Sequence, residues 1–234
     1  MIRAVCFDLD GTLVETEYLK ARSYADTVAE LRPGTEADDV VAAYGDLAGE
    51  ARETIAAALV AQFRVPVSEA RFLEMRLARY DDALADHALV RRQGYAPTIA
   101  LLRALRAEGW RTGMATMSYG AQARGMLAVL GLADAFDAVV TREDVRAPKP
   151  DPEIYAVLAA RLAVPPAECL AVEDSVPGVR AALAAGMRCV AAATALTRAS
   201  LRAAALLPPA LVVDDPADLA PVVRRLLAST GPDA

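Results

Sequence analysis

Short apolar runs recur along this chain and limit the folds open to it. The six runs span residues 2–7, 112–116, 138–140, 169–172, 189–192 and 211–213. Helix-like patterns lie between the later runs, near 97–109, 120–130, 151–162, 176–185 and 216–228. Strands that alternate with helices of about ten residues favour a parallel sheet covered by helices on both faces. We therefore expect an α/β protein with a Rossmann-like parallel sheet as its core.

The first connection is far longer than the others. After the strand-like run Ile2–Phe7, the next helix of the core pattern begins only near Pro97. Connections in such sheets are short, so the residues between must form a unit of their own. This stretch is helix-like at Leu19–Leu31, Glu50–Phe63 and Ser68–His87. We expect an inserted all-helical cap subdomain at residues 15–91, and a catalytic core built from residues 1–14 and 92–234.

Composition describes an ordinary globular chain. Apolar residues make up 55% of its 234 residues and charged residues 24%, which is enough for a sizeable core. No uncharged apolar stretch is long enough to span a membrane, and Asp8 interrupts the first apolar run too early for a secretory segment. The net charge of −6 argues against a nucleic-acid partner.

The use of cysteine points to a reducing compartment, the cytosol. Cys6, Cys169 and Cys189 each lie in a strand-like run and have no metal-like spacing, so we interpret them as small buried thiols. A cytoplasmic location follows from this pattern. We expect a monomer that has neither a membrane nor a nucleic-acid partner.

Two pairs of acids follow two of the expected strands. Asp8 and Asp10 come after the first, where Gly11 allows a sharp turn, and Glu173 and Asp174 come after the run at 169–172. An Asp-x-Asp pair alone is a weak signal, because acids end many strands where water is near. In a parallel sheet, however, all four project from one edge. Carboxylates that share a pocket repel one another unless a cation lies among them, and hard oxygen ligands favour Mg²⁺.

Two further loops supply complementary groups at this edge. Thr116, Met117 and Ser118 follow the second strand and offer hydroxyl and backbone N–H groups. Lys149 lies between two prolines in a stiff loop, and only one other of the 25 basic residues, Lys20, is a lysine. A compact ammonium suits phosphate as a point charge. A solvated loop lysine explains Lys149 taken singly, but it does not explain the four loops together. Ser175, by contrast, is best interpreted as a helix N-cap.

These motifs resemble the haloacid dehalogenase superfamily, in particular its phosphatases and beta-phosphoglucomutase-like enzymes with a helical cap. The resemblance rests on Phe7-Asp8-Leu9-Asp10-Gly11-Thr12, Met114-Ala115-Thr116, Lys149-Pro150 and Val172-Glu173-Asp174-Ser175, with Gly178 and the Ala-Gly-Met of 185–187 beyond. It covers nearly the whole core and is weak across the cap.

The resemblance implies a role for each residue of the core motifs. Asp8 would attack phosphorus to give an aspartyl phosphate, and Asp10 would act as general acid and then general base. Thr116 and Lys149 would hold phosphoryl oxygens, with Gly11, Met117 and Ser118 lining the substrate site. Mg²⁺ would be bound by the Asp8 carboxylate, the Asp10 backbone carbonyl and Asp174, with Glu173 assisting. The acid at position 10 disfavours the dehalogenating and carbon–phosphorus-cleaving branches.

The implied reaction is hydrolysis of a small phosphate monoester such as a sugar phosphate. A phosphosugar mutase is the alternative, but related mutases carry a cap histidine about where Lys20 falls, and the one histidine here is His87. A non-catalytic phosphate-ligand binder is the second alternative, which would not need both Asp8 and Asp10. Lys20 and Arg52 are candidates for contacting a second anionic group on the substrate, although a solvated helix face is the preferred interpretation of Arg52.

Overall fold

A six-stranded parallel sheet forms the centre of the computed structural model, which describes residues 1–48 and 50–228. The strands run in the order β3-β2-β1-β4-β5-β6. Their bounds are β1 Ala4–Phe7, β2 Arg111–Ala115, β3 Ala138–Val140, β4 Cys169–Glu173, β5 Arg188–Ala192 and β6 Val212–Val213. The α/β class expected from the sequence is confirmed.

The strand register brings the polar ends of three strands together. Phe7 of β1 lies beside Met114 of β2 on one side and beside Val172 of β4 on the other. The chain segments that follow Phe7, Met114 and Val172 therefore leave the sheet at the same carboxyl edge. The strand order also reverses at β1, and open parallel sheets bind ligands at such a switch point.

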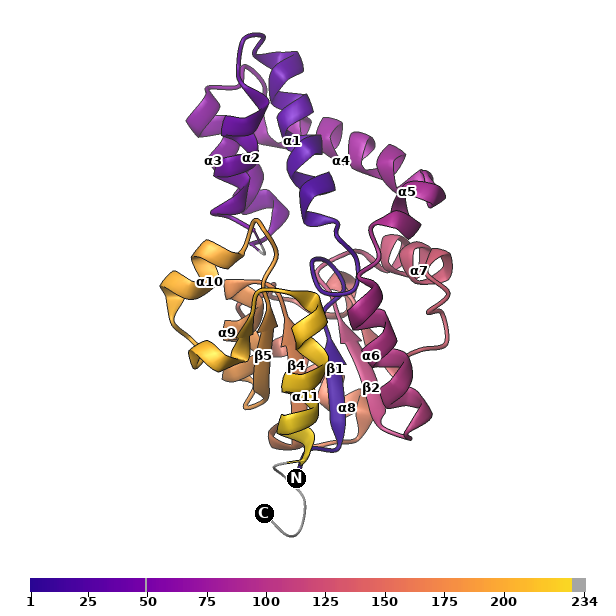
Figure 1. Cartoon of the computed structure of the whole chain (residues 1–234). Helices are drawn as coiled ribbons and strands as arrows, with labels where there is room; N and C mark the ends of the chain where they lie inside the picture. Colours follow the sequence, from indigo (N-terminus) through magenta and orange to yellow (C-terminus); the bar gives the residue numbers. More distant parts are fainter. Residues whose placement is uncertain (49, 229–234) are drawn as a thin grey trace.

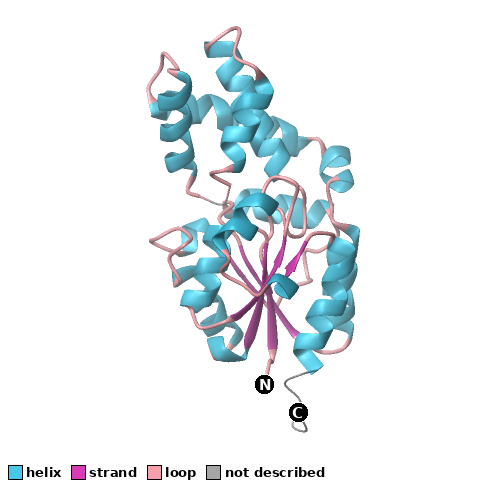
Figure 2. Ribbon diagram, turned by 60° about the vertical axis from the view of Figure 1, so that its left-hand side comes forward, coloured by secondary structure: helices cyan, strands magenta, loops and turns pink. Residues whose placement is uncertain are grey.

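Helices cover both faces of the sheet (Figure 2). In the core they are α6 Ala96–Ala107, α7 Gly120–Val129, α8 Glu153–Leu162, α9 Val176–Ala184, α10 Arg198–Ala204 and α11 Leu219–Ala228. Alternate strand residues point to opposite faces, so Val5 and Phe7 pack in the cluster with α6 and α11. Ala4 and Cys6 pack in the other cluster, with α8 and α9, where small strand side chains let the helices approach closely.

In the described part of the long first connection there are five helices: α1 Glu17–Leu31, α2 Ala37–Gly45, α3 Arg52–Phe63, α4 Glu69–Ala85 and α5 His87–Arg92. They lie above the carboxyl edge of the sheet (Figure 1). The first four enclose a hydrophobic cluster of their own, with Tyr24, Tyr44 and Phe72 fully buried within it. We call residues 15–91 the helical insertion. Its division from the core at these boundaries stays a prediction.

The sequence patterns missed some elements and misplaced others. Helix α2 carries Asp38 and Asp39 in its first turn and is short, so its apolar pattern is weak. The pattern expected at 68–87 divides into α4 and α5 because the Asp86 side chain accepts a hydrogen bond from the Leu89 N–H and caps a new helix. Helix α10 was missed because Leu201 is its one buried residue.

The interpretation of the cysteines as small buried thiols is confirmed. All three cysteines are buried and unpaired. Within the described residues no helix combines the length and the apolar character needed to cross a bilayer.

Candidate active site

Lys149 forms the polar centre of the sheet edge. Its ammonium donates hydrogen bonds to Asp8 Oδ1 at 2.7 Å, Glu173 Oε1 at 2.6 Å and the Ala115 carbonyl at 3.1 Å. These three acceptors match the three donors of an ammonium, and the residue is only 3% exposed. The loop that holds Lys149 is thereby fixed against the ends of β1, β2 and β4.

Glu173 is held from a second direction. The hydroxyl of Tyr155 on α8 donates to Glu173 Oε1 at 2.5 Å, and the Lys149 ammonium lies 5.2 Å from the Tyr155 ring centroid. Tyr155 was not expected from the sequence, because it lies on the buried face of α8 beside Ile154 and resembles an ordinary core residue. A tyrosine on an otherwise aliphatic helix face was the one signal that could have found it.

Asp10 accepts hydrogen bonds on both of its oxygens. Oδ1 accepts from Thr16 and lies 2.9 Å from the Lys20 ammonium, whereas Oδ2 accepts from Thr116 at 2.9 Å and Ser118 at 2.7 Å. Burial acts to raise the pKa of Asp10, but the Lys20 charge and the hydroxyl donors outweigh it and bring the pKa to about 2. Asp10 is therefore ionised in this arrangement.

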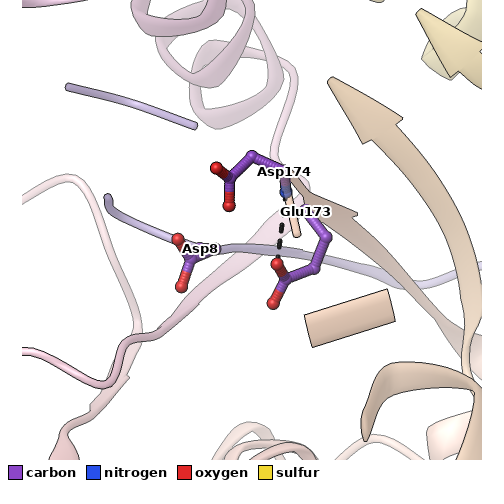
Figure 3. A group of neighbouring side chains, drawn as sticks. All are labelled: Asp8, Glu173 and Asp174. Atoms are coloured by element: carbon purple, nitrogen blue, oxygen red, sulfur yellow. Dashed lines mark hydrogen bonds between the residues drawn. The ribbon is translucent and has the colours of Figure 1, made fainter. Parts of the chain in front are cut away.

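Asp8, Glu173 and Asp174 form a compact carboxylate cluster (Figure 3), in which one oxygen from each lies within 4.8 Å of the others. Burial raises the pKa of Asp8 to about 8 against the opposing charge of Lys149. Burial likewise raises the pKa of Asp174 well above its ordinary value, and the charges of Glu17 and Asp8 add to this. Both shifts mean that the cluster holds more negative charge than its protein partners stabilise.

A divalent cation fits this cluster. The Oδ2 atom of Asp174 is buried and has no hydrogen-bond partner among the described residues. The site contains more negative than positive charge. Among the described residues only two ammonium groups, those of Lys20 and Lys149, form ion pairs with its carboxylates, and Lys20 is shared with Glu17. The four carboxylates are those of Asp8, Asp10, Glu173 and Asp174. Hard carboxylate oxygens without nitrogen or sulfur ligands suit Mg²⁺.

Gly11 makes room for the cluster. Its φ is +78°, and a Cβ atom at this position would lie 2.0 Å from Asp174 Oδ2. From the sequence, Gly11 was expected to be a substrate-binding residue. In the structure its clearest contact is with the Asp174 carboxylate, so the absence of a side chain is the contribution of this position.

We expect Gly11→Ala to weaken Mg²⁺ binding about 10–100-fold, as displacement of a group around a metal site does, because the new methyl group displaces Asp174. The backbone strain adds about 1–2 kcal/mol of destabilisation. Mg²⁺ titration followed by enzyme activity and by thermal unfolding measures the two effects. Gly109→Ala is the matched control, because Gly109 also has a positive φ (+83°) but has open space around its Cβ position. Equal Mg²⁺ affinities in the two variants would contradict the prediction.

A cavity lies between the sheet edge and the helical insertion. Asp8, Asp10, Lys149 and Asp174 line it from the core, together with Met117 and Ser118. Helices α1, α3 and α4 line it from above. The structure thus brings the sequence-predicted catalytic acids and Lys149 to one cavity, with Thr116 behind them in contact with Asp10.

Lys20 and Arg52 also line the cavity, but protein groups already engage both. Lys20 is shared between Asp10 and Glu17 Oε1, which lies 2.7 Å away. Arg52 donates to the Tyr119 hydroxyl at 2.5 Å, and its guanidinium carbon lies 4.2 Å from the Tyr119 ring centroid. Since Tyr119 precedes α7 of the core, Arg52 links the helical insertion to the core rather than lying on a solvated helix face.

Sequence reasoning missed four other residues of the site: Thr16, Glu17, Arg76 and Tyr80. Thr16 reaches Asp10 only through the fold of the loop after β1, and no local pattern marks it. Glu17 pairs with Lys20 across one turn of α1, at a spacing of three that is a local signal of a helix. Arg76 and Tyr80 did carry a signal. With Phe72 they form the buried residues of α4 at a spacing of four, and an arginine interrupts an otherwise aromatic face.

A parallel sheet with an acid pair after its first strand, a buried lysine and a second acid pair defines a haloacid dehalogenase-like class of enzyme. Residues 2–186 match the family model described as haloacid dehalogenase-like hydrolase. The chain belongs to this family of hydrolases.

Curated relatives extend the similarity over most of the chain. The chain is 34% identical over 208 residues to the protein CbbY of Cereibacter sphaeroides, and the match covers 85% of this chain and 87% of that one. It is 32% identical over 218 residues to the chloroplastic protein SUPPRESSOR OF QUENCHING 1 of Arabidopsis thaliana, covering 92% of this chain. The chain spans only 20% of the length of that second relative.

A solved structure shows the same arrangement. A variant of CbbY from Rhodobacter sphaeroides in complex with xylulose-1,5-bisphosphate superposes with a TM-score of 0.71 and is 26% identical. The match covers 94% of this chain and 96% of that one.

Proposed function

We propose that this protein hydrolyses a small phosphate monoester, a sugar phosphate or similar metabolite, through an aspartyl phosphate on Asp8. The observation that carries the proposal is the contrast between Asp8 and Asp10, two residues apart at one strand end. Lys149 binds one oxygen of Asp8, while the other accepts no hydrogen bond from the described residues and is free to act as nucleophile. Asp10 is instead held by four donors, which suits a group that transfers protons.

The reaction divides into two displacements at phosphorus. In the first, a carboxylate oxygen of Asp8 forms a bond to phosphorus and the ester P–O bond breaks. Asp10, which is ionised in the absence of substrate, must first take up a proton from solvent and then gives that proton to the leaving oxygen. In the second, water attacks the phosphorus of the aspartyl phosphate and gives a proton to Asp10. The bond between phosphorus and the Asp8 oxygen breaks, so inorganic phosphate is released and Asp8 is restored. In this proposal Lys149 stabilises the phosphoryl oxygens. The proposed acid–base role of Asp10 is supported by the hydrogen bonds that Thr116 and Ser118 donate to its carboxylate.

Lys20 connects this chemistry to the helical insertion. Its ammonium, on α1, is the largest influence that lowers the pKa of Asp10. The ionised form that Lys20 favours is the form that accepts a proton from water in the second displacement.

Mg²⁺ would be held by the carboxylates of Asp8 and Asp174 and by the backbone carbonyl of Asp10, with Glu173 fixed behind them by Tyr155. When bound, it would neutralise charge on the phosphoryl group and the cluster.

Substrate size follows from the covered cavity. The helical insertion lies over the sheet edge, so a closed site favours a small metabolite over a protein or nucleic acid. The complex of CbbY with a sugar bisphosphate supports a sugar phosphate. A cytoplasmic location and a monomeric state accompany the proposal.

We expect phosphate release from a panel of small phosphorylated metabolites to depend on Mg²⁺. Removing the metal with a chelator should lower the rate at least about 100-fold, because the carboxylate cluster then repels the phosphoryl group, and restoring Mg²⁺ should recover it. The measurement is initial-rate phosphate release with and without the metal.

The alternatives give different results in the same assay. A mutase would release no net phosphate and would isomerise a sugar phosphate when a bisphosphate primer is present. A non-catalytic binding protein would bind a compound of the panel and turn over none. Either result would overturn the proposed hydrolysis.

A further inference from the structure

Arg76 is a buried cation that has no hydrogen-bonding partner among the residues described by the structure. It lies on α4 of the helical insertion, lines the cavity and is only 4% exposed. Its Nε atom is buried and unpaired, and no carboxylate or carbonyl of the described residues accepts a hydrogen bond from its side chain. A buried guanidinium is costly unless its donors are satisfied.

The other cavity cations differ from Arg76 in this respect. Five cationic residues line the cavity: Lys20, Arg52, Arg76, Arg142 and Lys149. Lys20 and Lys149 bind carboxylates, Arg52 binds Glu53 and Tyr119, and Arg142 donates to the Val145 carbonyl. Within residues 1–48 and 50–228, Arg76 is therefore the one cavity cation none of whose donors binds a protein group.

Two tyrosines orient the guanidinium without satisfying it. Its central carbon lies 4.5 Å from the Tyr24 ring centroid and 4.7 Å from that of Tyr80. Cation–π contacts stabilise the charge through the flat faces of the group, whereas its N–H donors point outward in its plane. The two ring contacts thus hold the guanidinium in place without accepting its N–H hydrogen bonds.

Tyr80 adds a second unsatisfied donor at the same place. It lies one turn after Arg76 on the same face of α4, is 2% exposed and lines the cavity. Its hydroxyl is buried and has no hydrogen-bond partner among the described residues. A guanidinium and a phenol hydroxyl, both unpaired and adjacent, form a donor set that fits an oxyanion.

We infer that Arg76 and Tyr80 form a subsite for a second anionic group, a carboxylate or a phosphate, on the substrate whose phosphoryl group meets Asp8. This assignment rests on the proposed function, and it makes these two residues determinants of substrate specificity. The second group enters from the insertion side of the cavity, opposite the sheet edge, so one ligand spans both parts of the molecule. Phosphate esters that carry no second anionic group leave the subsite unsatisfied and bind more weakly.

Binding to the Asp8→Asn protein tests the subsite without requiring turnover. Calorimetry with Mg²⁺ present compares two pairs of compounds that differ in the second anionic group. The first pair, 2-phosphoglycolate and 2-hydroxyethyl phosphate, tests a carboxylate. The second pair, fructose 1,6-bisphosphate and fructose 1-phosphate, tests a phosphate. We expect the doubly anionic member of at least one pair to bind about tenfold or more tightly, and that pair identifies the group.

Arg76→Met, added to Asp8→Asn, should remove most of this preference, lowering the ratio of dissociation constants about tenfold or more while changing the singly anionic member little. Tyr80→Phe keeps the ring against the guanidinium and should lower the ratio by a smaller factor. Arg71→Met is the matched control, because Arg71 lies on the same helix and pairs on the surface with Glu74. Circular dichroism verifies folding of each variant.

Several outcomes would overturn the subsite. One is the absence of any preference for the doubly anionic member in either pair. Another is an equal loss of affinity for both members in Arg76→Met, which would mark a structural role. If Arg76→Met does not fold, an unchanged ratio in Tyr80→Phe and Arg76→Lys would have the same meaning. Failure of the proposed hydrolysis shows differently, as absent phosphate release by the protein with Asp8 intact.

Discussion

Replacing Asp8 with asparagine is expected to lower phosphate release at least about 10⁴-fold, because an amide cannot form the aspartyl phosphate. The substitution keeps the size of the side chain and its place beside Lys149. Initial rates with saturating Mg²⁺ measure the effect, and the Mg²⁺ content must be matched between variants. Residual activity within a factor of about 100 of the native rate would exclude Asp8 as the nucleophile.

The stability of Asp8→Asn, unlike its activity, should not fall below that of the native chain. Burial raises the folded-state pKa of Asp8 to about 8 from an ordinary value of 3.8, so its ionised form opposes folding increasingly as pH rises between these values. Without metal at neutral pH, Asp8→Asn should therefore unfold at a temperature no lower than the native chain. Mg²⁺ should stabilise the native chain and should stabilise Asp8→Asn much less. Asp134→Asn, at an exposed position, is the control and should behave like the native chain in both respects.

Replacing Lys149 with methionine should cost both activity and stability. The side chain keeps its length but no longer donates to Asp8, Glu173 and the Ala115 carbonyl. Removing one partner of a buried ion pair costs about 3–5 kcal/mol, and losing a charged donor at the reacting group costs about 10²–10³ in kcat. For a chain of this size such a loss corresponds to a fall of roughly 6–20 °C in the unfolding temperature.

The double variant Asp8→Asn/Lys149→Met separates the two causes of instability. Removing the Asp8 charge as well leaves one buried carboxylate fewer without a partner, so the double variant should be more stable than Lys149→Met alone. Chemical denaturation of the native chain, both single variants and the double variant gives a coupling free energy, which we expect to be about 1–3 kcal/mol. Additive effects, with no coupling, would show that Lys149 does not stabilise Asp8.

The core and its motif residues were within reach of the sequence because their signals are local. A short apolar run that ends in Asp8-Leu9-Asp10-Gly11 predicts a strand and a polar turn directly after its carboxyl end. Parallel pairing then brings every such end to one edge, so Lys149 and Asp174 could be assigned to the same site before any contact was known. The burial of the three cysteines was predictable because each lies in a short apolar run, which is also a local signal.

The insertion side of the cavity was decided by tertiary structure. Lys20 and Arg52 were chosen for their chemistry, but the packing of α1 and α3 over the core gives them protein partners in Asp10 and Tyr119. Arg76 interrupts the aromatic face of α4, but only the packing of α4 against α1 buries it beside the Tyr24 ring as well as the Tyr80 ring. Helix periodicity indicates which residues share a face, but it does not indicate which neighbour that face meets. Sequence alone therefore determined the reacting end of the site, where geometry follows from strand order, whereas only the packing of helices separated in the chain determined which cations remain open to a substrate.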